Sequence, residues 1–194
     1  MKQVGLFFGS FNPIHIGHLI IAQHILSHTE LQKIWFIVSP QNPFKPKETL
    51  LADYHRLALV NIAIEDNPNF RALDIEFQLP KPSYTINTLT HLAEKYPDTG
   101  FHLIMGEDNL NTLHKWKNAE QIATQFPIIV YPRIDEQQTP DSEFIHSLKL
   151  QRCDAPIVKI SSSYVRDLIK AGKQANYVLP EKVKNCIEEM HFYK

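Results

Sequence analysis

The stretch of sequence that decides the fold reads Val4-Gly5-Leu6-Phe7-Phe8-Gly9-Ser10-Phe11-Asn12-Pro13-Ile14-His15-Ile16-Gly17-His18-Leu19-Ile20-Ile21-Ala22. It begins with a short apolar run, residues 4–8, which predicts a buried strand. Gly9-Ser10 interrupts that run and Asn12-Pro13 signals a turn, after which apolar residues recur at helical spacing. We therefore predict a strand, a tight loop and a helix. The loop would lie at the carboxyl end of the first strand, where open α/β sheets bind their ligands.

The loop and the start of the helix suit an anionic ligand, because free backbone N–H groups and the helix dipole both attract phosphate. Gly9 can adopt a positive φ and lets a ligand approach the main chain. His15 and His18 project from the same face of one helical turn, so they could hold different oxygens of one polyphosphate. Gly17 between them is a poor helix former, and we expect its missing side chain to leave room for a bulky ring such as a nucleobase.

A pair of histidines at this spacing can also be two unrelated surface side chains, or half of a zinc site. The chain contains 10 His, so chance pairs are expected. No Cys and no further His stands nearby at the spacing of zinc ligands, and we therefore expect no metal ion bound by protein side chains.

Length and composition indicate a single domain that spans residues 1–194. The net charge of −1 gives no basic excess, so we expect no nucleic-acid partner. No apolar run approaches the roughly 18 residues of a membrane span, and no signal peptide is evident. The two cysteines, Cys153 and Cys186, suggest no disulfide framework. We expect a soluble, cytoplasmic protein, and the sequence carries no indication of an oligomeric state.

Strands and helices alternate along the chain, which predicts an α/β fold: a doubly wound, Rossmann-like parallel sheet with helices on both faces. The predicted strands are residues 4–8, 33–38, 71–78, 101–105, 127–131 and 156–160. The predicted helices are residues 15–28, 53–65, 85–96, 119–125, 161–171 and 180–190. The last two would form a small C-terminal helical part, residues 161–194. Residues 133–144 are polar and acidic and predict a surface loop.

Three further strand ends carry polar residues that could reach the same crevice. The proline-rich loop after the second strand contains Lys45 and Lys47, for which two solvated lysines on a turn are the alternative. Gly106 and Asp108 follow the fourth strand, and Arg133 follows the fifth. We expect a ligand site at the carboxyl edge of the sheet, within reach of these loops.

Two later helix starts are also potential anion sites. Ser83 and Thr85 are both possible caps of the third predicted helix. Ser161-Ser162-Ser163 begins the fifth predicted helix, with Arg166 on its first turn. A simple helix cap is the alternative for such a serine run. Here, however, hydroxyls, free N–H groups and a guanidinium converge, which suits the β- and γ-phosphates of ATP.

Two motifs on strand-to-helix junctions carry a resemblance to a known superfamily. The His15-x-Gly-His18 string and Ile160-Ser-Ser-Ser-x-x-Arg166 resemble the two signatures of the nucleotidyltransferases, whose second signature usually reads Ile-Ser-Ser-Thr-x-x-Arg. The middle segments narrow the resemblance to bacterial nicotinate-nucleotide adenylyltransferases. These segments are Ser83-Tyr84-Thr85-x-x-Thr88-Leu89, Met105-Gly106-Glu107-Asp108-x-Leu110, Trp116 and Tyr177-x-Leu179-Pro180-x-x-Val183.

The resemblance implies that ATP and nicotinate mononucleotide react to give deamido-NAD and pyrophosphate. It implies phosphate contacts from His15, His18, Lys45 and Arg166, with Ser162 and Ser163 at the β- and γ-phosphates. The other residues it assigns to ATP are Gly9, Ser10 and Phe11 in the first loop, Gly106 and Asp108 at the adenosine, and Arg133. The residues it assigns to the pyridine pocket are Tyr84, Thr85 and Trp116. The attacking 5′-phosphate would need no general base, and Mg²⁺ would be held mainly by phosphates and water.

Several positions depart from the pattern of the family. Asn12 stands where Asp is common, and Phe8 stands where Gly is frequent. The proline-rich loop has Phe44 where a histidine is frequent, and Ser163 replaces Thr but keeps the hydroxyl. These changes leave the main cluster of phosphate-binding candidates in place.

Other functions remain as alternatives. A phosphopantetheine adenylyltransferase or a cytidylyltransferase is the nearest, but Ser83-Tyr84-Thr85 together with Trp116 does not fit these enzymes. A non-catalytic nucleotide-binding regulator would not need the full set of phosphate-binding candidates. An oxidoreductase with a dinucleotide fold would require Gly-x-Gly-x-x-Gly after the first strand, which is missing. The sequence predicts no preference between the acid and the amide form of the mononucleotide.

Overall fold

The fold is built on one parallel sheet, and the computed structural model describes residues 1–40, 50–133 and 143–194 of the chain. Within these residues the sheet has six strands in the order β3-β2-β1-β4-β5-β6, and every neighbouring pair is parallel. The strands are β1 (Lys2–Gly9), β2 (Lys33–Val38), β3 (Phe70–Leu73), β4 (Thr99–Gly106), β5 (Ile128–Tyr131) and β6 (Leu150–Arg152). The strand order reverses between β1 and β4, so the predicted doubly wound, Rossmann-like sheet is confirmed.

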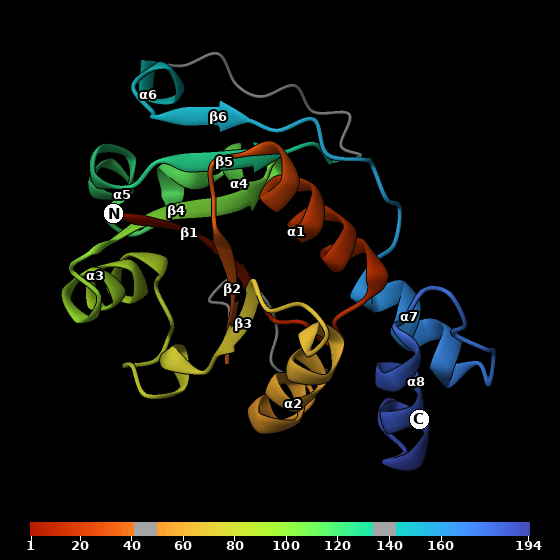
Figure 1. The fold of residues 1–194 in the computed structure, drawn as a ribbon. Helices are drawn as coiled ribbons and strands as arrows, with labels where there is room; N and C mark the ends of the chain where they lie inside the picture. The colour runs from red at the N-terminus through yellow and green to blue at the C-terminus, as the bar shows by residue number, and fades with distance from the viewer. Residues whose placement is uncertain (41–49, 134–142) are drawn as a thin grey trace.

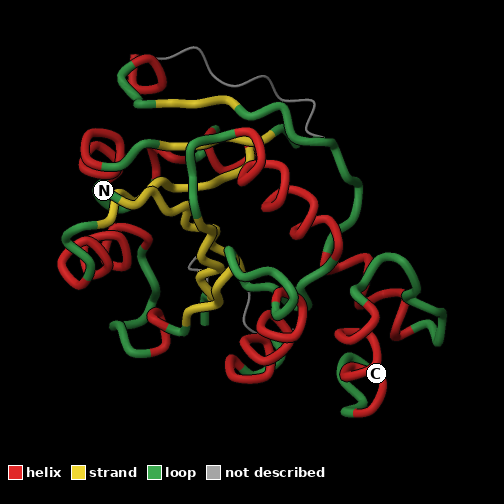
Figure 2. The backbone as a smooth tube through the Cα atoms, in the orientation of Figure 1, coloured by secondary structure: helices red, strands yellow, loops and turns green. Residues whose placement is uncertain are grey.

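Helices connect the strands and cover both faces of the sheet (Figure 1). They are α1 (Ile16–His28), α2 (Asp53–Ile64), α3 (Thr85–Lys95), α4 (Glu107–Leu110), α5 (Ala119–Gln125), α6 (Glu143–His146), α7 (Ser162–Lys170) and α8 (Glu181–Glu189), with the short 3-10 helices η1 (Ile75–Phe77) and η2 (Leu113–Lys115). Figure 2 shows the strands as one central layer, with the last two helices gathered at one side beyond α1 and α2. Among the described residues, no helix has both the length and the apolar character needed to cross a membrane.

Side chains of the inner strands alternate between two hydrophobic cores, one on each face of the sheet. In β1, Val4 and Leu6 belong to one core and Phe7 to the other. The core around Phe7 includes buried residues of α1, α2, α7 and α8, whereas the core around Leu6 includes buried residues of α3 and α5. Fully burying one such side chain stabilises a fold by about 1.5–3 kcal/mol. Burial on both faces therefore fixes the sheet between two helical layers and leaves its carboxyl edge for the connecting loops.

Two predicted strands differ from the observed ones. The third strand ends at Leu73 instead of extending to residue 78, because residues 75–77 form η1. The predicted strand at residues 156–160 is wrong, and the sixth strand is β6. Pro156 has no N–H to donate to a strand ladder, and none of residues 156–160 is buried. This segment instead connects the edge of the sheet to α7.

The helix starts agree only in part with the predicted caps. Ser161 occupies the N-cap of α7, and its Oγ accepts a hydrogen bond from the backbone N–H of Tyr164 at 3.1 Å. In α3 neither Ser83 nor Thr85 caps the helix, because the N-cap position falls on the tyrosine between them. The hydroxyl of Ser83 lies instead near the carboxyl of Glu76 in η1.

Candidate active site

The two signature loops lie against each other at the carboxyl edge of the sheet. The main-chain oxygen of Pro13 accepts a hydrogen bond from Ser162 Oγ at 2.9 Å, and that of Asn12 accepts one from Arg166 Nη1 at 2.8 Å. Nη2 of the same guanidinium donates to Ser163 Oγ at 3.1 Å. Residues 149 and 154 positions apart in the sequence therefore border one site, next to the strand at which the order of the sheet reverses.

The two histidines of the first loop are packed face to face. His15 is the N-cap of α1, and its ring stacks on that of His18 with centroids 3.7 Å apart. The backbone N–H of His15 donates to His18 Nδ1 at 3.2 Å, so the neutral form of His18 carries its proton on Nε2. Burial, with a further contribution from the positive charge of Arg133, lowers the pKa of His15 to about 4. His15 is therefore a neutral imidazole near pH 7, buried at the start of α1.

The glycines of this region make room for rings of the protein itself. A Cβ atom added to Gly17 would lie 3.1 Å from two ring atoms of His15, so the space predicted for a nucleobase is taken by this imidazole. A Cβ added to Gly9 would lie 2.9–3.1 Å from the ring of Phe11. Gly9 does not use its freedom to adopt a positive φ, whereas Phe11 in the same loop has φ 44°. Phe11 as a whole residue is only 2% exposed, and its ring packs in the core.

The residues after β4 and β5 meet across the loop. Arg133 Nε lies 3.4 Å from Asp108 Oδ1, and both side chains are partly exposed. The guanidinium also lies over the ring of Tyr131, 5.5 Å from its centroid. A Cβ atom added to Gly106 would overlap Asp108 Oδ1 and lie 3.0 Å from Arg133 Nε, so both side chains would have to shift to make room for it. The positive charge of Arg133 also lowers the pKa of His15, so Arg133 and its partner Asp108 lie close enough to the histidine pair to interact with it electrostatically.

One cavity is shared by the first loop and the segments that border α3 and η2. Gly9 and Ser10 line it together with residues of β1, β4 and β5. Its wall also includes residues of η1, the start of α3 and the end of η2 with the two residues that follow: Glu76, Ser83, Tyr84, Thr85, Lys115, Trp116 and Lys117. The three residues predicted for a pyridine pocket therefore do line one cavity. Lys117 Nζ lies over the Tyr84 ring, 4.6 Å from its centroid, which places a positive charge at the rim.

Arg56 was not predicted as a site residue, yet it joins the loops after β1 and β2. Its side chain is fully buried and its Nη1 donates to the main-chain oxygens of Ser10 and of Ser39, the latter at 2.8 Å. Nε donates to the Leu51 oxygen at 2.9 Å, and Nη2 pairs with Asp53 at 2.6 Å. Arg56 shares the buried stripe of α2 with apolar residues three and four positions further on. A charged residue on such a stripe was the signal that could have identified it.

Glu76 is a second site residue that the sequence analysis missed. It is 2% exposed, and its Oε1 accepts a hydrogen bond from Thr88 Oγ1 at 2.8 Å. Burial raises the pKa of this carboxyl, although the hydroxyls of Ser39, Thr88 and Ser83 partly oppose the rise. The carboxyl links η1 to the first turn of α3, beside the cavity. In the sequence Glu76 alternates with the apolar Ile75 and Phe77, a pattern that predicts an exposed position on a strand. Its burial follows from the 3-10 helix that forms there instead of a strand.

Lys45 lies outside the described residues, as do Lys47 and Phe44. The part of the chain that the structure describes contains no group of three or more His, Cys, Asp or Glu side chains that could hold a metal ion.

Comparison with known proteins defines the class of protein. A model of the family described as Cytidylyltransferase-like matches residues 6–168, a range that contains both signature loops and the cavity. The fold and the joined loops are thus those of a cytidylyltransferase-like nucleotidyltransferase.

Individual relatives narrow this class. A probable nicotinate-nucleotide adenylyltransferase of Flavobacterium psychrophilum is 53% identical over 192 residues, which cover 99% of each chain. A relative of the same name from Bacteroides fragilis is 42% identical and covers 96% of this chain and 92% of its own. The chain belongs to the nicotinate-nucleotide adenylyltransferase family. The fold is also that of the Plasmodium falciparum nicotinic acid mononucleotide adenylyltransferase complexed with NaAD, with a TM-score of 0.80, 18% identity and coverage of 100% and 98%.

Proposed function

We propose that this protein transfers AMP from ATP to nicotinate mononucleotide and so makes deamido-NAD and pyrophosphate. The observation that carries the proposal is the pair of hydrogen bonds from Ser162 and Arg166 to the first loop. These bonds hold the proposed polyphosphate-binding residues beside the cavity, whose wall includes the indole of Trp116 and the N-terminus of α3. Residues 1–194 would act as one nucleotidyltransferase domain, with the two small molecules as its partners.

The first loop and α7 would bind the triphosphate of ATP. His18 can donate from Nε2, since its Nδ1 already accepts a backbone hydrogen bond. Ser163 and Arg166 would contact the β- and γ-phosphates, with Ser162 holding the loop. The neutral His15 adds a ring and a hydrogen-bonding edge without adding charge. Lys45, outside the described residues, is proposed to reach the phosphates from the proline-rich loop.

Adenosine would lie at the ends of β4 and β5. Gly106 would lie beside the adenosine, where its missing side chain leaves room for Asp108 and Arg133. Asp108 would offer a carboxylate to a ribose hydroxyl. Arg133 Nε lies 3.4 Å from Asp108 Oδ1 and would orient this carboxylate. The positive charge of Arg133 would also attract the phosphates of ATP. Backbone groups of Gly9, Ser10 and Phe11 would complete the ATP side.

The part of the cavity that is lined by Tyr84, Thr85 and Trp116 would bind the pyridine ring. A flat ring stacked on the indole of Trp116 gains about 0.5–1.5 kcal/mol beyond burial. Its carboxylate needs donors, and the backbone N–H groups of Tyr84 and Thr85 stand at the N-terminus of α3, where the helix dipole also favours negative charge. Lys117 above the Tyr84 ring adds to this positive potential.

The reaction would be an in-line displacement at the α-phosphorus of ATP. An oxygen of the mononucleotide 5′-phosphate forms the new P–O bond while the bond to the β-phosphate oxygen breaks and pyrophosphate leaves. The nucleophile is already anionic near pH 7, so the step needs no general base. His18 and Arg166 would neutralise charge that builds up on the transferred and leaving phosphates. Mg²⁺, when bound, supplies further neutralisation of the leaving pyrophosphate.

The test is direct detection of the dinucleotide product. Purified protein with ATP and Mg²⁺ is incubated with nicotinate mononucleotide or with phosphopantetheine, and products are identified by mass spectrometry. We expect deamido-NAD in an amount equal to the pyrophosphate released. Turnover of phosphopantetheine without turnover of the pyridine nucleotide would contradict the proposal, and so would ATP binding with no product from either acceptor.

A further inference from the structure

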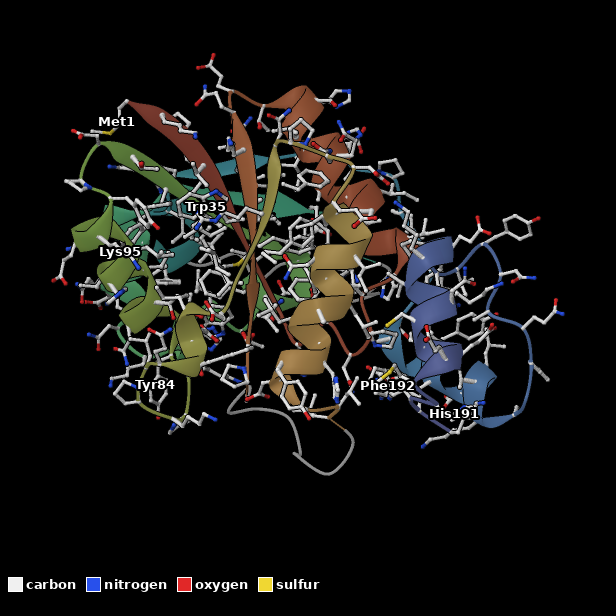
Figure 3. All side chains as sticks on the ribbon, turned by 60° about the horizontal axis from the view of Figure 1, so that its bottom comes forward. Met1, Trp35, Tyr84, Lys95, His191 and Phe192 are labelled. Atoms are coloured by element: carbon white, nitrogen blue, oxygen red, sulfur yellow. The ribbon has the colours of Figure 1, made fainter. Side chains whose placement is uncertain are left out.

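The segment after α8 folds back toward the first loop. The backbone N–H of Phe192 donates to the Ile187 oxygen at 3.0 Å, and His191 and Tyr193 have φ values of 56° and 65°. These left-handed residues reverse the chain direction at the end of the helix. The Phe192 ring then packs against His55 of α2, with centroids 4.6 Å apart, and lies beside α2 in Figure 3. The reversal delivers the next side chain to the carboxyl edge of the sheet.

Tyr193 ends on a residue of the proposed ATP loop. Its hydroxyl donates to Asn12 Oδ1 at 2.9 Å, and the same oxygen accepts the backbone N–H of Leu51 at 3.1 Å. Burial raises the pKa of the Tyr193 phenol, so this hydroxyl keeps its proton and can donate. Asn12 is itself only 2% exposed. The amide oxygen is therefore held from two directions inside the protein.

Asn12 also contacts the guanidinium of Arg166 in α7, through its main chain. The main-chain oxygen of Asn12 accepts the Arg166 Nη1 hydrogen bond at 2.8 Å. Side chain and main chain of Asn12 thus connect the tyrosine hydroxyl to the guanidinium through one residue. A shift of the Asn12 peptide would displace the Arg166 Nη1 group that the proposed function places at the phosphates.

We propose that Tyr193 is a positioning residue for ATP: its hydroxyl fixes Asn12, and Asn12 sets the position of Arg166. The proposal rests on the proposed function only in taking the Arg166 side of the site as the place of the triphosphate. Tyr193 is not one of the residues that line the cavity, and in this scheme it touches neither substrate. Loss of the Tyr193 hydroxyl should therefore weaken the binding of ATP and leave the binding of nicotinate mononucleotide unchanged.

The first test compares Tyr193→Phe with Tyr177→Phe. Both variants lose one hydroxyl, but Tyr177 is 91% exposed, so it controls for the substitution. Loss of one buried hydrogen bond should raise KM for ATP by about three- to tenfold in Tyr193→Phe, with KM for nicotinate mononucleotide unchanged. Tyr177→Phe should match the wild type. Unchanged KM for ATP in Tyr193→Phe, or an equal rise for both substrates, would overturn the proposal.

The second test asks whether the effect passes through Arg166. In an Arg166→Met background, Tyr193→Phe should cause no further rise in KM for ATP, since the group it positions is gone. An effect as large as in the wild-type background would overturn the proposed connection. ATP affinity measured by calorimetry without acceptor gives the same comparison. If the wild type makes no dinucleotide, the proposed function fails, whereas the calorimetric comparison still decides the role of Tyr193.

Discussion

Replacing His15 with asparagine should weaken the dependence of protein stability on pH below neutrality. The imidazole is 4% exposed and its pKa falls from the ordinary 6.5 to about 4 in the folded protein. The unfolded chain therefore takes up a proton on this residue before the folded protein does. Its contribution to stability is fully present above about pH 6.5 and is lost as the pH falls toward 4.

The magnitude follows from the two pKa values. At about pH 5 the imidazole is almost entirely protonated in the unfolded chain and mostly neutral in the folded protein. The difference corresponds to about 2 kcal/mol of the free energy of unfolding, relative to about pH 7.5. The wild type should therefore lose about 2 kcal/mol more than His15→Asn between these two pH values.

Urea unfolding at the two pH values, followed by far-UV circular dichroism, measures this difference. His114→Asn removes an exposed imidazole and controls for the substitution itself. Equal losses of stability in the wild type and in His15→Asn would refute the argument, because they would mean that folding leaves the proton affinity of His15 unchanged. An NMR titration of His15 in labelled protein gives the same answer directly, with a midpoint near 4 expected.

Three further substitutions test other parts of the site. His18→Ala should lower kcat for pyrophosphate release by about 10²–10³-fold if this imidazole stabilises transition-state charge, and a folded variant with wild-type kcat would remove it from the mechanism. Trp116→Ala should raise KM for nicotinate mononucleotide far more than KM for ATP in steady-state kinetics; an equal rise in both would contradict the stacking assignment. Arg56→Met should cost about 3–5 kcal/mol in urea unfolding because it leaves several main-chain carbonyls without their buried donor and removes the 2.6 Å ion pair with Asp53. The exposed Arg71→Met is its control, and equal costs for the two would argue against the Arg56 network.

The strand, loop and helix around the first loop could be predicted because each is decided by neighbouring residues. A continuous apolar run, an Asn12-Pro13 turn and helical spacing after it are local signals, and β1 and α1 follow them closely. The strand at 156–160 was wrong because three apolar residues near a proline do not distinguish an edge strand from a surface connection. Only the pairing of β6 with β5, a contact between distant residues, decides between them.

The candidate site shows the same division. Signature residues such as His15 and Arg166 were identified from local patterns, and the structure brings them to one edge of the sheet. Arg56 and Glu76 were missed, because their importance lies in burial and in partners from other elements. The role of Gly17 was also misjudged, since sequence spacing cannot tell whether a ligand ring or a protein ring fills the space above it.

In the proposed reaction this site transfers AMP to a pyridine mononucleotide, and hydrogen-bond donors at the start of α3 bind the carboxylate of its pyridine ring. Initial rates of pyrophosphate release, measured with ATP, Mg²⁺ and equal concentrations of nicotinate mononucleotide or its amide, test it most directly. We expect faster release with the acid, because a carboxylate offers two acceptor oxygens to the N–H groups of Tyr84 and Thr85 and a negative charge to Lys117, whereas the amide offers one acceptor and no charge. Faster release with the amide would contradict the pocket assignment, and no release with either would contradict the proposed reaction itself.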